Sequence, residues 1–344
     1  MKAGRTIKVG GDREALFSRF SAILDSTHLS EGVFLRELED RVGDLYGSDA
    51  VAFNSAGSAL LAIWAYHEHT SGVGREWLVP TNTFWATAGM FRGSALVDCS
   101  MKDFCMSLDT LVAARKPHHY GVVLTHVGGS LATDYKRIAD YCHSTGMVLV
   151  EDAAHVLGCP AVEGPLVGSL SHATVFSLYS TKAIPVGEGG ILLTRDVDLA
   201  SFARKYRDYG KSYQGGIVSY SRNGYNLRMD EWTAAVACHQ VSRIPDILGL
   251  RSEDAYKLSR VVPPMLDHSS GTNWYKYIVP TDFGASRTVG RVYASTDQVH
   301  TILSDGGEFP GADWVAANHI CLPIGEDSYG GMTLAEVEQF LLGA

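Results

Sequence analysis

Two reactive side chains follow short apolar runs of the sequence. The run Val148–Asp152 ends in the carboxylate of Asp152, and the run Ala173–Leu178 leads through a polar loop to Lys182. Such runs predict buried strands, and open α/β sheets bind ligands at the carboxyl ends of their strands. Both side chains are therefore candidates for one site, although Asp152 would also suit a helix N-cap and Lys182 a solvated surface position.

Small residues after a third apolar run predict an anion-binding turn. Ala56, Gly57 and Ser58 come shortly after Ala50–Asn54 and open a predicted helix. The free N–H groups of the first helical turn bind phosphate, and small side chains let the phosphate approach them. Phe84 follows a fourth apolar run and is either packed in the interior or a platform for a flat ligand ring.

These segments together offer an amine, a carboxylate, an aromatic ring and an anion-binding turn. Pyridoxal 5'-phosphate (PLP) requires this set, because a lysine binds its aldehyde, a carboxylate keeps its ring nitrogen protonated, an aromatic side chain stacks on its ring and a turn anchors its phosphate. Ser177 and the glycine-rich stretch 187–190 add a hydroxyl group and tight turns beside Lys182. The sequence contains neither a G-x-x-x-x-G-K-[ST] motif nor a strand-linked G-x-G-x-x-G motif, so we favour PLP as the cofactor.

The elements that position these residues alternate along the first two thirds of the chain. Amphipathic stretches at Ser58–His69, Tyr135–Thr145 and Leu199–Tyr209 predict helices between the strands. Several strands are apolar on both faces, as in a mainly parallel sheet buried between helices, and an α/β architecture is expected. The predicted strands are Ala50–Asn54, Trp77–Pro80, Ala95–Asp98, Gly121–His126, Val148–Asp152, Ala173–Leu178 and Gly190–Thr194.

The regular alternation fades near residue 245. We predict a large PLP-binding domain over residues 1–245 and a smaller C-terminal α/β domain over residues 246–344, and we expect the first 25 or so residues to pack on the smaller domain. The stretch 215–228 is rich in Gly, Tyr, Ser and Asn and is predicted to be a long loop leading into a helix at Asp230. A last helix is predicted near Leu334–Leu342.

Composition excludes several classes of protein. The 344 residues are 46% hydrophobic and 19% charged, as in globular proteins, and the net charge of -9 disfavours nucleic acid as a partner. No apolar run reaches the ~20 residues that span a membrane and the N-terminus lacks an apolar signal stretch, so we expect a cytoplasmic protein without a membrane partner. Six scattered cysteines predict reduced thiols, and the triplet His67-Glu68-His69 is interpreted as polar surface, so no metal site is expected.

The sequence resembles the DegT–StrS family of PLP-dependent sugar aminotransferases, which have fold type I. The resemblance runs from about Leu29 to Gln240, with a weaker echo at Cys321-Leu-Pro-Ile. The resemblance is specific because four matching segments occur in the same order as in the family. They are Glu151-Asp-Ala-Ala-His155 through Gly158, Phe176-Ser to Lys182, Gly187-Glu-Gly-Gly190 and Gly224-Tyr-Asn-Leu-Arg-Met-Asp230.

The resemblance implies roles for individual positions. Lys182 takes the place of the lysine that binds PLP covalently. Asp152 takes the place of the carboxylate at the pyridine nitrogen, and His155 takes the place of a residue near the phenolic oxygen. Asn226 matches an asparagine that reaches the cofactor phosphate of the neighbouring subunit, which implies a homodimer with shared active sites. Further cofactor contacts are implied for Ala56, Gly57, Ser58, Phe84 and Ser177.

The sequence also departs from the family. Gly57 stands where the family usually has a threonine, so a hydroxyl ligand is lost and Ser58 is the candidate to replace it. The C-terminal third, which helps to shape the substrate pocket, matches poorly. Tyr179 and Arg228 are candidate substrate-binding residues, with plain packing the alternative for Tyr179 and a structural ion pair the alternative for Arg228.

Because Lys182 is retained, the resemblance implies transamination in two half-reactions. The expected donor is L-glutamate or L-glutamine, and the expected acceptor is a nucleotide-linked keto-deoxyhexose of amino-sugar biosynthesis, as in antibiotic pathways. Two alternatives remain open. One is an aminotransferase for a cyclitol such as a keto-inositol, as in aminoglycoside biosynthesis, and the other is a non-catalytic relative that binds PLP or a sugar.

Overall fold

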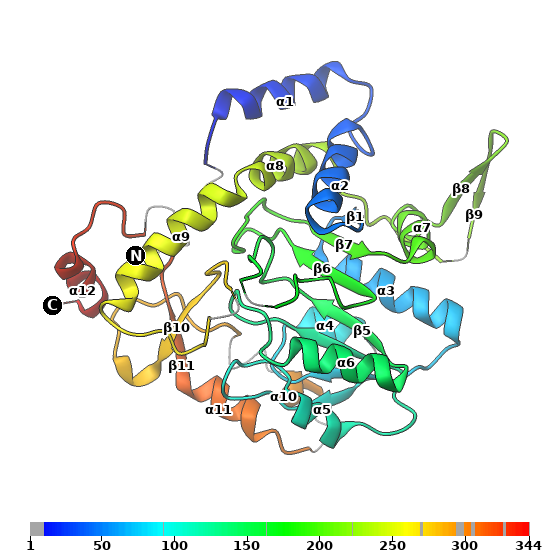
Figure 1. Ribbon diagram of the computed structural model, residues 1–344. Helices are drawn as coiled ribbons and strands as arrows, with labels where there is room; N and C mark the ends of the chain where they lie inside the picture. Colours follow the sequence, from blue (N-terminus) through cyan, green and yellow to red (C-terminus); the bar gives the residue numbers. More distant parts are fainter. Residues whose placement is uncertain are drawn as a thin grey trace.

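Seven strands form the central sheet of the protein (Figure 1). The computed structural model describes residues 10–91, 93–162, 164–221, 223–268, 271–293, 299–303, 307–325 and 328–343. The strand order is β1-β7-β6-β5-β4-β2-β3, and β7 runs antiparallel to both of its neighbours while the other pairs are parallel. The strands are β1 (Asp49–Phe53), β2 (Trp77–Pro80), β3 (Ala95–Val97), β4 (Gly121–Thr125), β5 (Val148–Asp152), β6 (Ala173–Ser177) and β7 (Gly190–Thr194).

The sheet confirms the predicted α/β class and a mostly parallel architecture. Each strand begins and ends within one residue of its predicted bounds. The prediction succeeds because the central strands are buried on both faces, which makes their apolar runs continuous.

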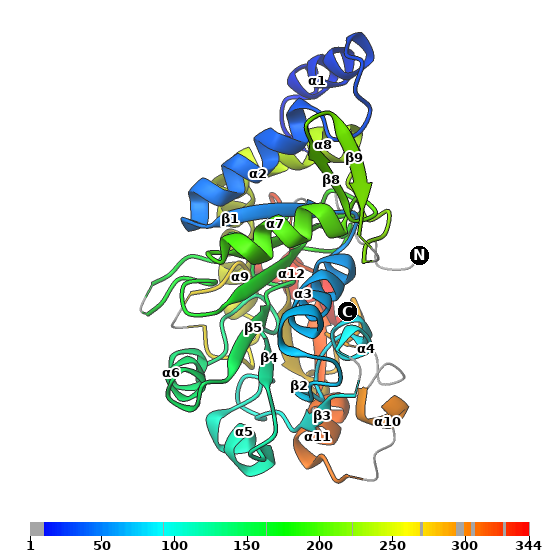
Figure 2. The same cartoon turned by 90° about the vertical axis from the view of Figure 1, so that its right-hand side faces the viewer.

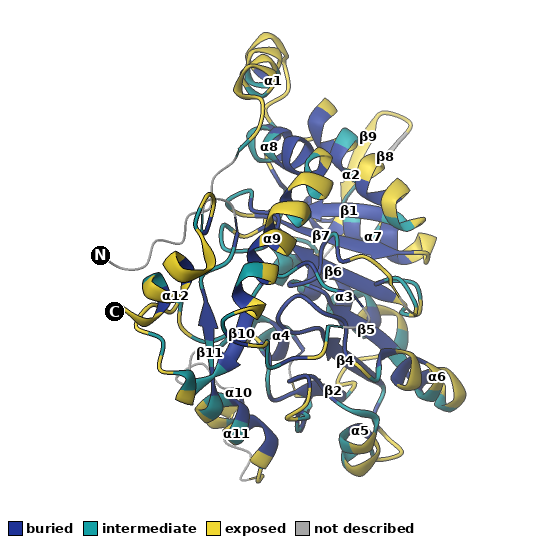
Figure 3. Cartoon of the chain, turned by 60° about the vertical axis from the view of Figure 1, so that its left-hand side comes forward, coloured by how far each residue is buried: buried dark blue, intermediate teal, exposed yellow. Residues whose placement is uncertain are grey.

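Helices cover both faces of the sheet and make it the middle of three layers (Figure 2). One face packs against α3 (Ala56–Ser71), α4 (Trp85–Met90) and α7 (Val197–Tyr206). The other face packs against α2 (Val33–Tyr46), α5 (Leu108–Ala114), α6 (Tyr135–Thr145) and α8 (Glu231–Ser242). The strands between these layers are dark blue in Figure 3 because they are buried.

The N-terminal helix α1 (Arg13–Asp25) lies on α2 and α8. Arg19 pairs with Glu37 at 2.9 Å, and the ring of Phe20 lies 5.7 Å from that of Trp232. The contact with the C-terminal domain that we expected for the first 25 residues stays a prediction, and residues 1–9 lie outside the described residues.

The C-terminal part has a small hydrophobic core of its own. Buried apolar side chains between Ala255 and Leu341 form a cluster distinct from the two that flank the sheet. The predicted boundary at residue 245 stays a prediction. The elements here are α9 (Ile244–Ser259), β10 (Tyr277–Pro280), η1 (Thr281–Phe283), α10 (Val299–Leu303), α11 (Pro310–Asn318), β11 (His319–Leu322) and α12 (Leu334–Leu342).

A β-hairpin replaces part of the loop predicted over residues 215–228. Its strands, β8 (Lys211–Gln214) and β9 (Ile217–Tyr220), project from the body at the upper right of Figure 1. The described residues of β9 are all exposed, so the hairpin lacks the burial pattern that identifies a strand in a sequence.

Two further expectations concern the chain as a whole. All six cysteines are buried and free of disulfides. Within the described ranges, no helix combines the length and the apolar character needed to cross a membrane.

Candidate active site

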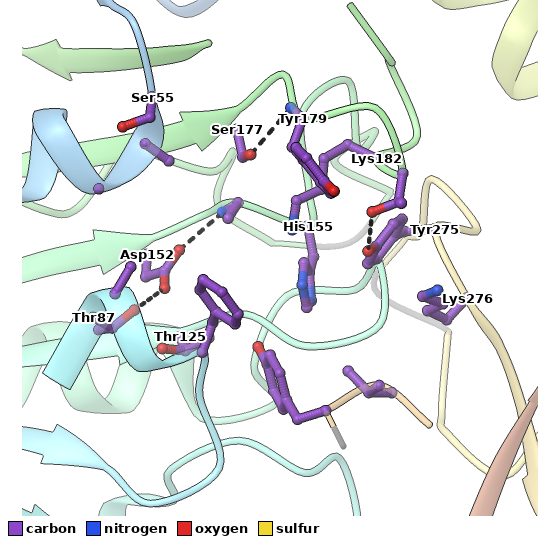
Figure 4. Close-up of a pocket in the computed structure, with 18 of the residues that line it drawn as sticks. Ser55, Thr87, Thr125, Asp152, His155, Ser177, Tyr179, Lys182, Tyr275 and Lys276 are labelled. Carbon is purple, nitrogen blue, oxygen red and sulfur yellow. Dashed lines mark hydrogen bonds between the residues drawn. The ribbon is translucent and has the colours of Figure 1, made fainter. Parts of the chain in front are cut away.

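The predicted site residues gather around one cavity of about 650 Å³ at the carboxyl ends of β5 and β6 (Figure 4). Asp152 is the last residue of β5 and Ser177 the last of β6, so the strand-end argument holds for both. Eight of the predicted residues line the cavity: Ala56, Gly57, Phe84, Asp152, His155, Ser177, Tyr179 and Lys182.

Asp152 is a buried carboxylate that lacks a cationic partner. Only 4% of the residue is exposed. Its oxygens accept hydrogen bonds from the Thr87 hydroxyl and, at 3.1 Å, from the backbone N–H of Ala154. Among the residues that the structure describes, no lysine, arginine or histidine forms an ion pair with it. Because an unpaired buried charge is costly, this carboxylate suits a ligand that brings a positively charged N–H group.

His155 is a neutral hydrogen-bond donor at the cavity wall. The backbone N–H of Gly128 donates to its Nδ1 at 3.3 Å, so the proton of the neutral ring resides on Nε2. Burial holds the pKa of His155 well below its usual value, and the positive charges of Lys182 and Lys276 lower it further. The ring therefore offers an Nε2–H to an acceptor such as a phenolate oxygen.

The first turn of α3 forms the expected anion site. Ser55 caps the helix by accepting a hydrogen bond from the N–H of Ser58, whereas the N–H groups of Ala56 and Gly57 have no intrahelical partner at these positions. The start of β7 lies against this turn, because a Cβ atom at Gly190 would come within 2.3 Å of the backbone nitrogen of Ala56.

The two serines near this turn differ in their placement. Ser177 lines the cavity, and its oxygen accepts a hydrogen bond from the N–H of Tyr179 at 3.3 Å, which leaves its own proton free to bind a phosphate. Ser58 does not line the cavity, because its hydroxyl donates to the side chain of Asn54 at 2.6 Å. The lost threonine hydroxyl at Gly57 is thus not replaced by Ser58.

Lys182 lies in the loop that follows β6. The loop is held by a 2.9 Å hydrogen bond from the N–H of Lys182 to the carbonyl of Tyr179. The Nζ atom of Lys182 lies 5.1 Å from the centre of the Tyr275 ring, and both residues line the cavity. The lysine is therefore packed at the site and not directed into bulk solvent.

Several cavity residues were missed in the sequence. They are Thr87, Tyr275, Lys276, Arg291 and Tyr293. Tyr275 and Lys276 precede the apolar run that becomes β10, whereas site residues were expected only after such runs. Burial alone would raise the pKa of the Tyr275 phenol, but the nearby positive charges of Lys182 and Lys276 lower it.

Two predicted residues lie away from the cavity of their own chain. Arg228 pairs with Asp208 and packs over the ring of Tyr209, so the structural ion pair is the role that the structure shows for it. Asn226 lies opposite Asp208 in an isolated bridge and does not line the cavity.

Histidine clusters outside the cavity have structural partners. His67, interpreted as surface, is buried instead, with its Nδ1 atom 2.9 Å from the hydroxyl of Tyr120. The side chains of Glu76, His118 and His119 lie close enough together to suggest a metal site. However, the N–H of Lys116 donates to Nδ1 of His119, so Nε2 of that ring carries the proton and is a poor ligand.

Comparisons with known proteins agree on one family. The family model described as the DegT/DnrJ/EryC1/StrS aminotransferase family matches residues 11–339. The spore coat polysaccharide biosynthesis protein SpsC of Bacillus subtilis is 29% identical over 75% of this chain and 71% of its own, and the GDP-perosamine synthase of Caulobacter vibrioides is 30% identical over 80% and 76%. Among solved structures, DesI in the presence of its TDP-sugar product is 27% identical, covers 98% of this chain and 90% of its own, and superposes with a TM-score of 0.82.

Proposed function

The chain belongs to the DegT/DnrJ/EryC1/StrS aminotransferase family, and we propose that it moves an amino group from L-glutamate or L-glutamine to a nucleotide-linked keto-deoxyhexose. Aminotransferases of this family depend on PLP. The observation that carries the proposal is the pairing of a buried, cation-free carboxylate with a lysine in one cavity, at Asp152 and Lys182.

The residues present fit PLP. The Asp152 carboxylate would accept the N–H of the protonated pyridine ring, and the His155 Nε2–H would donate to the phenolic oxygen. Ser177 and the first-turn N–H groups of α3 would hold the phosphate, and the half-exposed ring of Phe84 would stack on the cofactor. When bound, PLP supplies the aldehyde that takes up the amino group and an electron sink for the bonds at the amino carbon.

The side chains of this chain perform the proton chemistry. Lys182 would hold the cofactor through its Nζ amine, and as a free base that amine would carry the proton at the amino carbon of the substrate. The hydrogen bond from Thr87 fixes the orientation of the Asp152 carboxylate, which would face the ring nitrogen of the cofactor. Tyr275 contacts both Lys182 and His155 and so limits the space in which the amine moves.

The proposed acceptor class rests on the relatives. GDP-perosamine synthase is named for a nucleotide sugar, and the DesI structure was determined with a TDP-sugar product. We extend this acceptor class to the present chain, because the match covers about three quarters of the first relative and nine tenths of the second.

A spectroscopic assay of the half-reactions tests the proposal. The purified protein is loaded with PLP, desalted and mixed with L-glutamate or L-glutamine, and the visible absorbance of the bound cofactor should shift. Addition of a nucleotide-linked 4-keto-6-deoxyhexose should restore it. Lys182→Ala should abolish both changes, whereas Lys136→Ala, an exposed lysine paired with Asp140, should leave them intact.

Three results would contradict the proposal. One is a protein that does not retain PLP, which favours a non-catalytic relative. Another is full turnover by Lys182→Ala. The third is recovery of the absorbance with a keto-inositol and with none of the nucleotide sugars, which favours the cyclitol alternative.

We also propose a homodimer in which each subunit completes the site of the other. Asn226 lies away from its own cavity, and the nearby hairpin β8–β9 exposes large apolar side chains at Tyr213, Ile217 and Tyr220. Helix α1 exposes Phe17 and Leu24 in the same way. The apolar side chains of the hairpin gather on one short projecting element, which supports a subunit interface because contiguous exposed apolar surface marks interaction sites.

A further inference from the structure

Two basic side chains from the C-terminal part of the chain line the cavity without an acidic partner. Lys276 lies just before β10, and Arg291 lies in the segment after η1. Both residues are partly buried. Across the described ranges of the chain, neither forms an ion pair or a side-chain hydrogen bond, and the cation–π contact of Lys276 with Tyr275 is the one polar contact of these two side chains.

Two other cations of limited exposure are paired with carboxylates. Arg19 pairs with Glu37 at 2.9 Å, and Arg207 pairs with Glu39. The pairing compensates for the loss of hydration when a charge is removed from water. Lys276 and Arg291 lack this compensation, so an anion supplied from outside the chain would provide it.

The backbone holds both residues in place without using their charges. The N–H of Lys276 donates to the carbonyl of Gly128 at 2.9 Å, and its Nζ atom lies 4.8 Å from the centre of the Tyr275 ring. On either side of Arg291, the carbonyl of Gly290 accepts from Cys321 at 2.7 Å and the N–H of Val292 donates to His319 at 3.0 Å. The two side chains are therefore presented to the cavity by fixed segments.

These cations lie apart from the turn that would hold the cofactor phosphate. In Figure 4, Ser55 of that turn and Lys276 lie on opposite sides of His155. The anion-binding turn belongs to α3 of the large sheet layer, whereas Lys276 and Arg291 come from the C-terminal part. One phosphate group at the turn would leave both cations unsatisfied.

We propose that Lys276 and Arg291 form a second anion site, which binds the oxyanion of a reactant. The carboxylate of the amino donor and the phosphate of a nucleotide-linked acceptor share the required chemistry, because both present oxygen atoms to an ammonium and a guanidinium group. The identity of the reactant rests on the proposed function, whereas the anion site itself does not. The net charge of -9 makes such a local positive site the feature that would attract an anionic reactant to this cavity.

Calorimetric titration of the PLP-loaded protein tests the site without turnover. Pyrophosphate stands in for the acceptor's phosphates and glutarate for the donor's carboxylates, and bound PLP keeps both probes out of the turn at α3. We expect Lys276→Met and Arg291→Met each to weaken the binding of one probe by about 10- to 100-fold. The controls Lys136→Met and Arg137→Met remove cations that pair with Asp140 and Asp134 outside the cavity, and binding should not change.

The two half-reactions then distinguish the source of the anion. A rise in KM for L-glutamate alone, with kcat within a few-fold, assigns the site to the donor carboxylate. A rise in KM for the nucleotide-linked sugar alone assigns it to the acceptor phosphates. The visible absorbance of bound PLP and the melting temperature show that each variant is folded, and Arg291→Met tests the site independently if Lys276→Met does not load.

The inference is overturned if the parent protein binds neither probe, or if both variants bind the probes as tightly as the parent. A parent protein that binds a probe through Lys276 and Arg291 but transfers no amino group would contradict the proposed function and leave the anion site standing.

Discussion

At the scale of the residue, the charge of Asp152 is the feature that a cofactor ring would use. We predict that Asp152→Asn lowers kcat/KM by about 10- to 100-fold, because a neutral amide cannot hold a proton at the ring nitrogen and a charge-assisted hydrogen bond is worth about 1.5–3 kcal/mol. Thr87→Val keeps the charge and removes one hydrogen bond to it, so its effect should be smaller. Stopped-flow absorbance of the donor half-reaction measures both.

The loss of kcat/KM should be larger for Asp152→Asn than for Thr87→Val. If Thr87→Val were as damaging as Asp152→Asn, the carboxylate would matter through its packing and not through its charge. Cofactor absorbance after desalting must be similar in both variants for the comparison to hold.

Gly57 offers a gain-of-function test at the same scale. A Cβ atom at this position would meet Ala86 at 3.6 Å and Ser55 at 3.8 Å, which are ordinary contacts, and the backbone there needs no glycine. We predict that Gly57→Thr tightens PLP binding by up to about tenfold, since its hydroxyl would reach the phosphate site and a hydrogen bond to a charged group contributes about 1.5 kcal/mol or more. Fluorescence titration of the apoprotein with PLP measures the change.

The matched control is Gly57→Ala, which adds the Cβ atom without the hydroxyl. It should raise the melting temperature, because alanine favours a helix by about 1 kcal/mol over glycine, and leave PLP affinity nearly unchanged. Equal gains in affinity from alanine and threonine would refute the role of the hydroxyl.

Residue types at strand ends were enough to predict Asp152, Ser177 and Lys182 as neighbours. Position after a strand does not predict a cavity residue where a side-chain rotamer or a segment distant in the sequence decides whether the residue lines the cavity. Ser55 and Ser58 are indistinguishable as cavity residues in the sequence, and their roles depend on the cap that Ser55 forms and the bond between Ser58 and Asn54.

At the scale of the element, β5 supplies two adjacent carboxylates to opposite faces of the sheet. Asp152 faces the cavity, and Glu151 is fully buried on the other face. Glu151 accepts hydrogen bonds from Tyr135 at 2.7 Å and from the backbone of Gly168 at 3.1 Å, and it also contacts His126 at 2.9 Å. The Glu-Asp pair of the sequence therefore combines one structural carboxylate with one functional carboxylate.

The packing of α3 on β2 predicts a loss of stability in acid. Burial lowers the pKa of His67 to about 4, whereas the unfolded chain has the usual value of 6.5. Because the unfolded state takes up the proton first, the free energy of unfolding should fall as the pH drops from 6.5 to 4, by roughly 3 kcal/mol for this residue. His67→Phe should reduce that loss, and urea unfolding between pH 4.5 and 7 measures it.

The neighbouring histidine of the same helix provides the control. His69 is exposed, so His69→Phe should leave the slope of stability against pH unchanged. In His67→Phe, the hydroxyl of Tyr120 keeps a hydrogen bond to Ser71 at 2.8 Å, which limits the damage at neutral pH. Equal slopes in the parent and in His67→Phe would show that other groups govern the acid sensitivity.

Burial also explains which elements could be predicted. The strands of the large sheet are apolar throughout because helices cover both faces, and helix α6 has the predicted bounds because one face is buried. The hairpin β8–β9 leaves the described residues of β9 in solvent, so its strands carry no alternation that a sequence analysis could detect. Its apolar side chains would be buried only if another chain packed against them.

At the scale of the whole molecule, the hairpin and α1 expose apolar surface that a monomer would leave in water (Figure 3). Tyr213, Ile217 and Tyr220 are each between 65% and 72% exposed. We predict that the protein is a dimer by light scattering, and that the double variant Ile217→Lys, Tyr220→Lys shifts it toward the monomer. Val73→Lys, which charges a loop residue that is 92% exposed, is the control that should leave the mass unchanged.

Mixing two inactive variants tests whether the subunits of the proposed dimer share their active sites. Lys182→Ala removes the amine, and Asn226→Ala removes the side chain assigned to the partner's phosphate site. Each proposed site combines Lys182 of one subunit with Asn226 of the other. In a dimer of the two variants, one site therefore lacks both side chains and the other site has both. A one-to-one mixture that exchanges subunits freely should therefore recover about a quarter of the parent sites, measured as kcat per bound PLP. If Asn226 served the cavity of its own chain, every site in the mixture would keep one defect, and activity would not rise above the average of the two variants.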